Sequence, residues 1–227
     1  MNLAFTRTKL FSVFLLLFCC GLNLAAQAQD IVVAKDGTGN YTSVQAAIDA
    51  APTNRTTPYI IQIKNGVYKE KISIPSNKPY IYLFGESVAN TILTHDDYSG
   101  KAMPGGGTYG TSTSASVTVN ANNFFAKNIT FENTTGDAPQ ALAINVNSDK
   151  AAFKNCRFLG GQDTVLANGD GKRQYFKDCY IDGVVDFIFG SSRAVFENCV
   201  IYAKDRKDNL SGSYITAANT QAGQEHG

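Results

Sequence analysis

The segment Phe153-Lys-Asn-Cys156 recurs as Phe176-Lys-Asp-Cys179 and again as Phe196-Glu-Asn-Cys199. A degenerate earlier copy, Ala-Lys-Asn-Ile-Thr-Phe, spans residues 126–131, so the copies start at 126, 153, 176 and 196. A short pattern that returns at intervals of a few tens of residues predicts a solenoid, in which each repeat forms one coil that covers the next.

Every copy carries an Asn or Asp at its third position, and these residues are Asn128, Asn155, Asp178 and Asn198. Asn and Asp tolerate the left-handed backbone conformation, so we expect them at a repeated corner. A fixed corner with loops of variable length is typical of a parallel β-helix, and the general rule for parallel crossovers makes it right-handed. The sequence therefore predicts an all-β chain that forms a right-handed parallel β-helix, a single-stranded solenoid.

One amphipathic helix is predicted ahead of the repeats. Between Thr42 and Ala51 the apolar residues recur at helical spacing, Thr42 or Ser43 can cap the start, and Pro52 ends it. We expect this helix to cap the exposed N-terminal end of the coils. Strand-like runs are predicted at 30–34, 59–64, 71–74, 80–84, 91–94 and 213–217, and residues 96–114, rich in Gly, Ser and Thr, are expected to leave the coil as a loop.

Residues 1–28 have the form of a secretory signal peptide. Two basic residues precede an apolar run from Leu10 to Leu24, and Ala26-Gln-Ala28 resembles a cleavage site. The alternative is an uncleaved membrane anchor, but the run is shorter than the ~20 residues that a span needs. We therefore expect a secreted protein, extracellular or periplasmic, with residues 29–227 as its mature domain and no membrane partner after cleavage.

The charge balance and the cysteines exclude several classes of protein. Cleavage after Ala28 would leave 18 basic and 19 acidic residues, and this nearly neutral balance does not predict binding to nucleic acid. Cys156, Cys179 and Cys199 recur with the repeat, so we interpret them as small apolar side chains inside the coils, against the alternative of a disulfide or metal role. We expect a monomer.

Two segments place an aspartate at the same point of successive repeats. Asp163, in Gly161-Gln-Asp-Thr-Val-Leu166, and Asp186, in Val184-Val-Asp-Phe-Ile-Phe-Gly190, each follow a repeat Cys by seven residues. Because strands of neighbouring coils lie roughly 4.8 Å apart, the two carboxylates are expected side by side.

The same step of 23 residues, taken backward from Asp163, reaches Gln140. We therefore expect a polar column of Gln140, Asp163 and Asp186, with Gln162 beside its middle member. An apolar column of Leu142, Val165 and Ile188 would follow two residues later.

Paired carboxylates of this kind suit acyl transfer. At about 5 Å they cannot both ionise freely, so one pKa rises and the other stays low, which provides an acid and a charged nucleophile at one pH. The two glutamine amides add N–H donors for a developing oxyanion. Two alternatives stay open on spacing alone: a solvated Asp/Asn ladder, and a glycoside hydrolase, since carboxylates ~5 Å apart also suit a retaining glycosidase.

Four motifs resemble those of the pectinesterase (pectin methylesterase) family, in order and approximate spacing: Gly66-Val-Tyr-Lys-Glu70, Gln140-Ala-Leu, Gly161-Gln-Asp-Thr164 and Asp186-Phe-Ile-Phe-Gly190. The match runs from about Ile31 to the end, and its last two motifs are the most specific. The resemblance implies a β-helix that removes methyl esters from pectin, a methylated homogalacturonan, giving pectate and methanol. It implies no metal and no other cofactor.

The resemblance also implies roles for individual residues. Asp186 is expected to attack the ester carbonyl, and Asp163 to protonate the departing methanol and then activate water. Gln140 and Gln162 would stabilise the tetrahedral intermediate. Candidate substrate contacts are Gln140, Ser114 and Phe189, against the simpler interpretations of Ser114 as a polar loop residue and of Phe189 as core.

One departure from the family pattern is large. The family carries a Leu-Gly-Arg-Pro-Trp motif downstream of the nucleophile, and this sequence contains no Trp. We therefore expect the N-terminal portion of a longer catalytic domain, and a non-catalytic pectin-binding role stays open. We expect His95 at the surface and Asp96-Asp97 in a solvated loop, with a calcium contact as the alternative.

Overall fold

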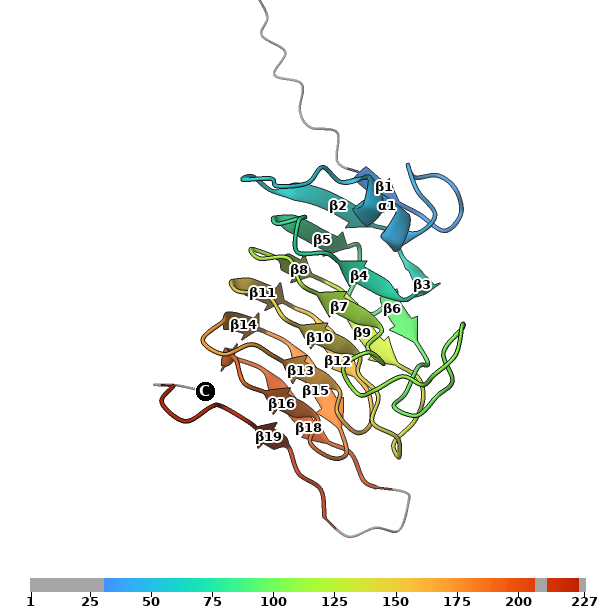
Figure 1. The fold of residues 1–227 in the computed structure, drawn as a ribbon. Helices are drawn as coiled ribbons and strands as arrows, with labels where there is room; N and C mark the ends of the chain where they lie inside the picture. Colours follow the sequence, from blue (N-terminus) through green and yellow to red (C-terminus); the bar gives the residue numbers. More distant parts are fainter. Residues whose placement is uncertain (1–30, 207–211, 225–227) are drawn as a thin grey trace, which may run out of the picture.

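The computed structural model describes residues 31–206 and 212–224. Within them, three parallel sheets run along the sides of a stack of coils, and the single helix α1 (Val44–Ala50) lies at its N-terminal end (Figure 1). This is the capped, right-handed parallel β-helix that the repeat predicts.

Each sheet takes one strand from every coil. Sheet I contains β1 (Ile31–Val33), β2 (Tyr59–Ile63), β5 (Ile81–Gly85), β8 (Phe125–Lys127), β11 (Ala151–Lys154), β14 (Arg173–Lys177) and β17 (Arg193–Glu197). Sheet II contains β3 (Gly66–Lys69), β6 (Thr91–His95), β9 (Thr130–Asn133), β12 (Arg157–Leu159), β15 (Tyr180–Gly183) and β18 (Val200–Ala203). Sheet III contains β4 (Ile72–Ile74), β7 (Val117–Val119), β10 (Ile144–Val146), β13 (Val165–Ala167), β16 (Ile188–Gly190) and β19 (Thr216–Ala218).

The repeated phenylalanines stack in register inside the coils. Phe153 pairs with Ala126 on one side and with Phe176 on the other, and Phe176 pairs with Phe196. The ring centroids of Phe153 and Phe176 lie 4.9 Å apart, and those of Phe176 and Phe196 lie 4.8 Å apart. The predicted alignment of the four copies is therefore confirmed, and it supplies much of the aromatic core.

The predicted corner is also confirmed. Asn128, Asn155, Asp178 and Asn198 have φ values of 58°, 50°, 55° and 53°, all in the left-handed region. Their side chains bond along the stack, since the amide of Asn155 donates to Oδ1 of Asn128 (2.8 Å) and that of Asn198 to Oδ1 of Asp178 (2.6 Å). These residues form the turn from sheet I to sheet II in the last four coils.

The three cysteines of the repeat behave as small core side chains. Cys156 and Cys179 are buried, Cys199 is half-buried, and all three are free thiols. Each Sγ lies 3.4–3.7 Å from a main-chain oxygen of the preceding coil. Burial raises the pKa of the Cys156 thiol above its ordinary value, as expected of an unreactive buried cysteine. The structural interpretation of these residues is confirmed.

Side chains from the following coils cap both ends of α1. At its N-terminus Ser43 accepts from the N–H of Ala46, and Glu70 accepts from the Ser43 hydroxyl (2.8 Å) and from the N–H groups of Val44 and Gln45. At its C-terminus the buried Lys78 donates to the carbonyls of Ile48, Asp49 and Ala51 (2.6–2.8 Å). The motif residue Glu70 thus has a structural role, because it satisfies donors that a short helix leaves unpaired.

The predicted strand runs at 30–34, 59–64, 71–74, 80–84 and 91–94 correspond to β1, β2, β4, β5 and β6, and the last predicted run overlaps β19. The strand β3 was not predicted, although its Tyr68 is fully buried. The predicted signal peptide lies outside the described residues. Among those that are described, no helix is long and apolar enough to cross a membrane.

Candidate active site

Asp163 and Asp186 occupy equivalent turns that lead into neighbouring strands of sheet III. Gln162 pairs with Val185 just before them, and Val165 pairs with Ile188 just after. This register places the two aspartates at the same point of successive coils, as the step of 23 residues predicts. Both have left-handed backbones, with φ values of 68° and 49°.

The environment of Asp163 favours its protonated form. Asp163 is only 3% exposed, whereas Asp186 is half-buried. Burial, and secondly the charge of the neighbouring Asp186, raise the pKa of Asp163 to about 7. A carboxyl group with this pKa can donate a proton near neutral pH and take one back within the same cycle.

The predicted polar column is wrong in one member. Gln140 pairs with Gln162 rather than with Asp163, and the N–H of Ala141 donates to the carbonyl of Gln162 (3.1 Å). The reason is that this coil is shorter than the next, so the step of 23 residues does not extend backward. The two glutamines are consequently neighbours just before β10 and β13 of sheet III, one residue before the level of Asp163.

The predicted apolar column is also corrected. The buried residues in register are Ile144, Val165 and Ile188, and Leu142 does not join them. Leu142 packs instead with Ala115 and Leu166 in a second small cluster.

Phe189 lies against this second cluster and is only half-buried. It pairs with Leu166, which in turn pairs with Asn145, in the row of sheet III that faces away from the main core. Phe189 is therefore not a residue of the main core, and its position three residues after Asp186 is compatible with the predicted sugar contact.

Ser114 does not suit the predicted role of a sugar contact. The residue is fully buried, its hydroxyl donates to the carbonyl of Thr111 (2.6 Å), and it accepts from the N–H of Leu142 (3.2 Å). The bond to Leu142 attaches the loop 96–114 to the segment after Gln140, and the bond to Thr111 closes a turn within the loop. The sequence could not show this, because a small hydroxyl in a Ser/Thr-rich loop is as useful for closing a turn as for binding a ligand.

Thr111, in the same loop, was not singled out from the sequence. Its hydroxyl donates to Oε1 of Gln140 at 2.8 Å. Three other Ser and Thr residues surround it in the sequence, and no local signal distinguishes it from them. Its contact depends on the path of the loop, which sequence spacing does not give.

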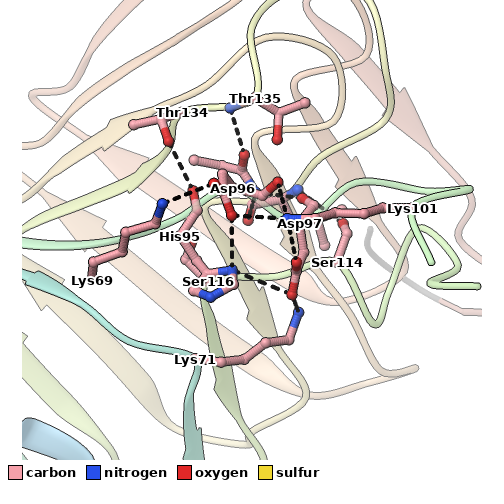
Figure 2. Close-up of polar contacts among 12 residues, drawn as sticks. Lys69, Lys71, His95, Asp96, Asp97, Lys101, Ser114, Ser116, Thr134 and Thr135 are labelled. Carbon is pink, nitrogen blue, oxygen red and sulfur yellow. Dashed lines mark hydrogen bonds and ion pairs between the residues drawn. The ribbon is translucent and has the colours of Figure 1, made fainter. Parts of the chain in front are cut away.

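A cluster of charges anchors the start of this loop (Figure 2). Asp97 is 3% exposed, so it is not solvated as predicted, and His95 ends β6 with its side chain 23% exposed. Lysine ammonium groups contact all four carboxylate oxygens: Lys69 and Lys101 bind Asp96 (2.8 and 2.9 Å), and Lys71 and Lys101 bind Asp97 (2.7 and 3.0 Å).

The electrostatics of this cluster favour lysine over a divalent cation. Hydrogen bonds from Lys69 and Lys101 hold the pKa of Asp96 well below its usual range. Burial acts to raise the pKa of Asp97, but the bonds from Lys71 and Lys101 outweigh it and the pKa is lowered. Although His95, Asp96 and Asp97 lie close enough to bind a metal, three ammonium groups already neutralise the two carboxylates.

A surface hollow of about 590 Å³ lies on a different face of the molecule. It follows the outside of sheet I, between Lys150, Tyr175 and Val195, and none of the predicted site residues lines it. The candidate site is therefore defined by the register of sheet III and not by the volume of a cavity.

Comparisons with known proteins identify the family of this chain. The family model described as Pectinesterase matches residues 30–227. Pectinesterase 31 of Arabidopsis thaliana is 41% identical over 208 residues, which is 88% of this chain and 62% of that protein. A pectinesterase of Petunia integrifolia is 40% identical over 88% of this chain and 52% of its own length.

Solved structures show the same relationship. Pectin methylesterase from carrot superposes with a TM-score of 0.78 at 38% identity, over 87% of this chain and 60% of the carrot chain. A pectin methylesterase in complex with a hexasaccharide superposes with a TM-score of 0.77 at 34% identity, over 87% and 63% of the two chains. This chain thus spans about 60% of the length of such relatives, and it belongs to the pectinesterase family.

Proposed function

We propose that the protein is a carbohydrate esterase that removes methyl esters from pectin and releases methanol and pectate. The observation that carries this proposal is the pair Asp163 and Asp186 on successive coils, with the pKa of Asp163 raised to about 7. The names of the relatives support the substrate, and one related structure is a complex with a hexasaccharide.

In the proposed first step, a carboxylate oxygen of Asp186 attacks the carbonyl carbon of the methyl ester. The side-chain N–H groups of Gln140 and Gln162 donate to the oxyanion that forms. These two residues pair with each other just before β10 and β13. When the tetrahedral intermediate collapses, the bond to the methoxy group breaks and Asp163 supplies the proton that makes it methanol. An acyl–aspartyl anhydride on Asp186 remains.

In the second step, the ionised Asp163 removes a proton from a water molecule that attacks the acyl carbon. The acyl bond to Asp186 then breaks, the galacturonate leaves as a free acid, and Asp163 keeps the proton for the next cycle. One group serves as acid and then as base, which requires a pKa close to the working pH. The cycle consumes one water and needs no group other than these side chains.

We also propose that residues 1–28 are removed on export, that residues 29–227 act outside the cytoplasm, and that the protein is a monomer. The absence of a spanning helix among residues 31–206 and 212–224 is compatible with export. Expression in a secreting host, with the N-terminus of the exported protein determined by mass spectrometry, tests the cleavage after Ala28. Retention of residues 1–28 in a membrane fraction would contradict it.

The catalytic proposal is tested by measuring methanol and new reducing ends released from methylated pectin. We expect methanol without reducing ends, and no methanol from Asp186→Asn, which keeps the shape of the side chain but removes the nucleophile. Reducing ends without methanol would show a glycoside hydrolase. Binding of oligogalacturonides without turnover, unchanged in Asp186→Asn, would show a non-catalytic binding module.

A further inference from the structure

Thr111 lies beside Gln140 and outside the four motifs that carry the family resemblance. We propose that Thr111 is a positioning residue for the esterase, and that its hydroxyl sets the Gln140 amide so that the N–H groups face the reacting carbonyl. This inference rests on the proposed function and adds to it the element that orients one oxyanion donor.

The polarity of the contact carries the proposal. The Thr111 hydroxyl donates to Oε1 of Gln140 at 2.8 Å. A glutamine amide has one acceptor oxygen and two N–H donors, so a donor on Oε1 leaves both N–H groups available. The reverse orientation would direct the amide oxygen at a developing negative charge, which opposes the reaction. In the orientation that the structure holds, both N–H groups are free to stabilise an oxyanion.

Gln140 needs such a contact because its side chain is exposed. Conformational entropy opposes the fixing of a glutamine side chain in one rotamer. A hydrogen bond to the side chain offsets much of this cost. Donors placed before the reaction starts are the ones that lower the barrier, because they need no reorganisation as the charge forms.

The loop 96–114, which carries Thr111, is anchored at both of its ends. At its start, buried Asp97 binds Lys71 and Lys101, as Figure 2 shows, and its carbonyl accepts from the side-chain amide of Asn133 (2.9 Å). At its end, buried Ser114 is bonded to the N–H of Leu142. A threonine carried by an anchored loop can restrain a mobile partner.

The same loop also forms hydrogen bonds with residues next to the site. The N–H of Ser99 donates to the carbonyl of Gln140 (2.9 Å), and the side-chain amide of Asn145 donates to the carbonyl of Ser112 (3.2 Å). The backbone and the side chain of Gln140 are thus both bonded to residues of one loop.

The experiment compares Thr111→Val, Thr111→Ser and the matched control Thr113→Val. Thr113 lies in the same loop, but its hydroxyl bonds only the backbone of Gly110. We expect Thr111→Val to lower kcat for methanol release roughly 10- to 100-fold, since loss of an oxyanion donor costs about 10²–10³. KM should change less than about threefold, Thr111→Ser should recover most of the activity, and Thr113→Val should stay close to wild type.

Gln140→Ala supplies the second readout. If Thr111 acts through Gln140, adding Thr111→Val to Gln140→Ala should cause little further loss of kcat. Additive losses, an equal loss in Thr113→Val, or failure of Thr111→Ser to recover activity would each overturn the proposal.

A third readout separates this proposal from the proposed function. In wild type we expect distinct, exchange-protected NMR signals for the Gln140 side-chain amide, and in Thr111→Val these should collapse toward free-glutamine values. If wild type releases no methanol, the proposed function fails, yet the NMR comparison still decides whether Thr111 fixes the amide. If wild type is active and neither the amide signals nor kcat respond to Thr111→Val, the positioning role alone is wrong.

Discussion

Replacing Asp163 by Asn should stabilise the protein, and increasingly so as the pH rises. The pKa of Asp163 is about 7 in the folded chain, against 3.8 for an ordinary aspartate. Below pH 3.8 the carboxyl group is protonated in both the folded and the unfolded chain, so it does not lower the free energy of unfolding. Between the two values the unfolded chain loses its proton first, so the free energy of unfolding falls as pH rises, and above pH 7 the loss is complete.

The size of the effect follows from the shift. About three pK units at 1.36 kcal/mol each give an upper limit of about 4 kcal/mol at pH 8. At pH 5.5 the same reasoning gives about 2 kcal/mol, and near pH 4 almost nothing. Asn has no proton to lose and tolerates the left-handed backbone, so Asp163→Asn should show the wild-type stability near pH 4 and a growing advantage above it.

Urea unfolding of wild type and Asp163→Asn at pH 4.5, 5.5, 6.5 and 8 measures this difference. Asp149→Asn is the control of opposite sign, because the hydrogen bonds from Arg173 hold the pKa of Asp149 at about 2. It should be less stable than wild type by a nearly constant amount over this range, because that deficit disappears only as the pH falls from 3.8 toward about 2. A pH-independent difference for Asp163→Asn, or a destabilisation that grows with pH, would refute the electrostatic account of the pair.

Four further outcomes are expected. Asp186→Asn should lower the pKa of Asp163, as measured by NMR titration of its carboxyl carbon, because one of its two causes is removed; an unchanged pKa would mean that the two groups do not interact. In wild type the first turnover should slow above pH 7, where Asp163 loses its proton, and a burst of methanol that stays constant to pH 9 would exclude Asp163 as the acid. Lys78→Met should destabilise the chain by about 1–3 kcal/mol, because three carbonyls at the end of α1, two of them buried, lose their donor, and thermal unfolding at the wild-type temperature would contradict this. Phe153→Ala should cost about 3–5 kcal/mol and Phe125→Ala, whose ring is only half-buried, much less; equal losses in urea unfolding would refute the inward stacking.

The fold was predictable because its information is local and repeated. The phenylalanines at 153, 176 and 196 and the corner residues at 155, 178 and 198 each recur at the same place in a coil. A register error would move every one of them to the wrong face, so a single consistent alignment fixes the stack. The same logic placed Asp163 over Asp186.

The details of the site were less predictable because they depend on coil length and loop path. One shorter coil moved Gln140 beside Gln162 and Leu142 out of the apolar column. Within the loop 96–114 several similar hydroxyls compete, and only three dimensions show that Ser114 closes a turn while Thr111 reaches Gln140. The burial of Asp97 depends on Lys71, from the segment before β4, and on Lys101, from the loop itself, and no single stretch of sequence reveals this pairing.

The left-handed backbones at 163 and 186 have a consequence for how this chemistry is lost in evolution. Residues with ordinary side chains strain such a turn, whereas Asp, Asn and Gly accept it. Descendants that abandon turnover while keeping an intact coil should therefore accumulate Asn or Gly at these two places. In a survey of homologous sequences, the residues at these two positions can then separate proteins that bind carbohydrate without turnover from damaged enzymes.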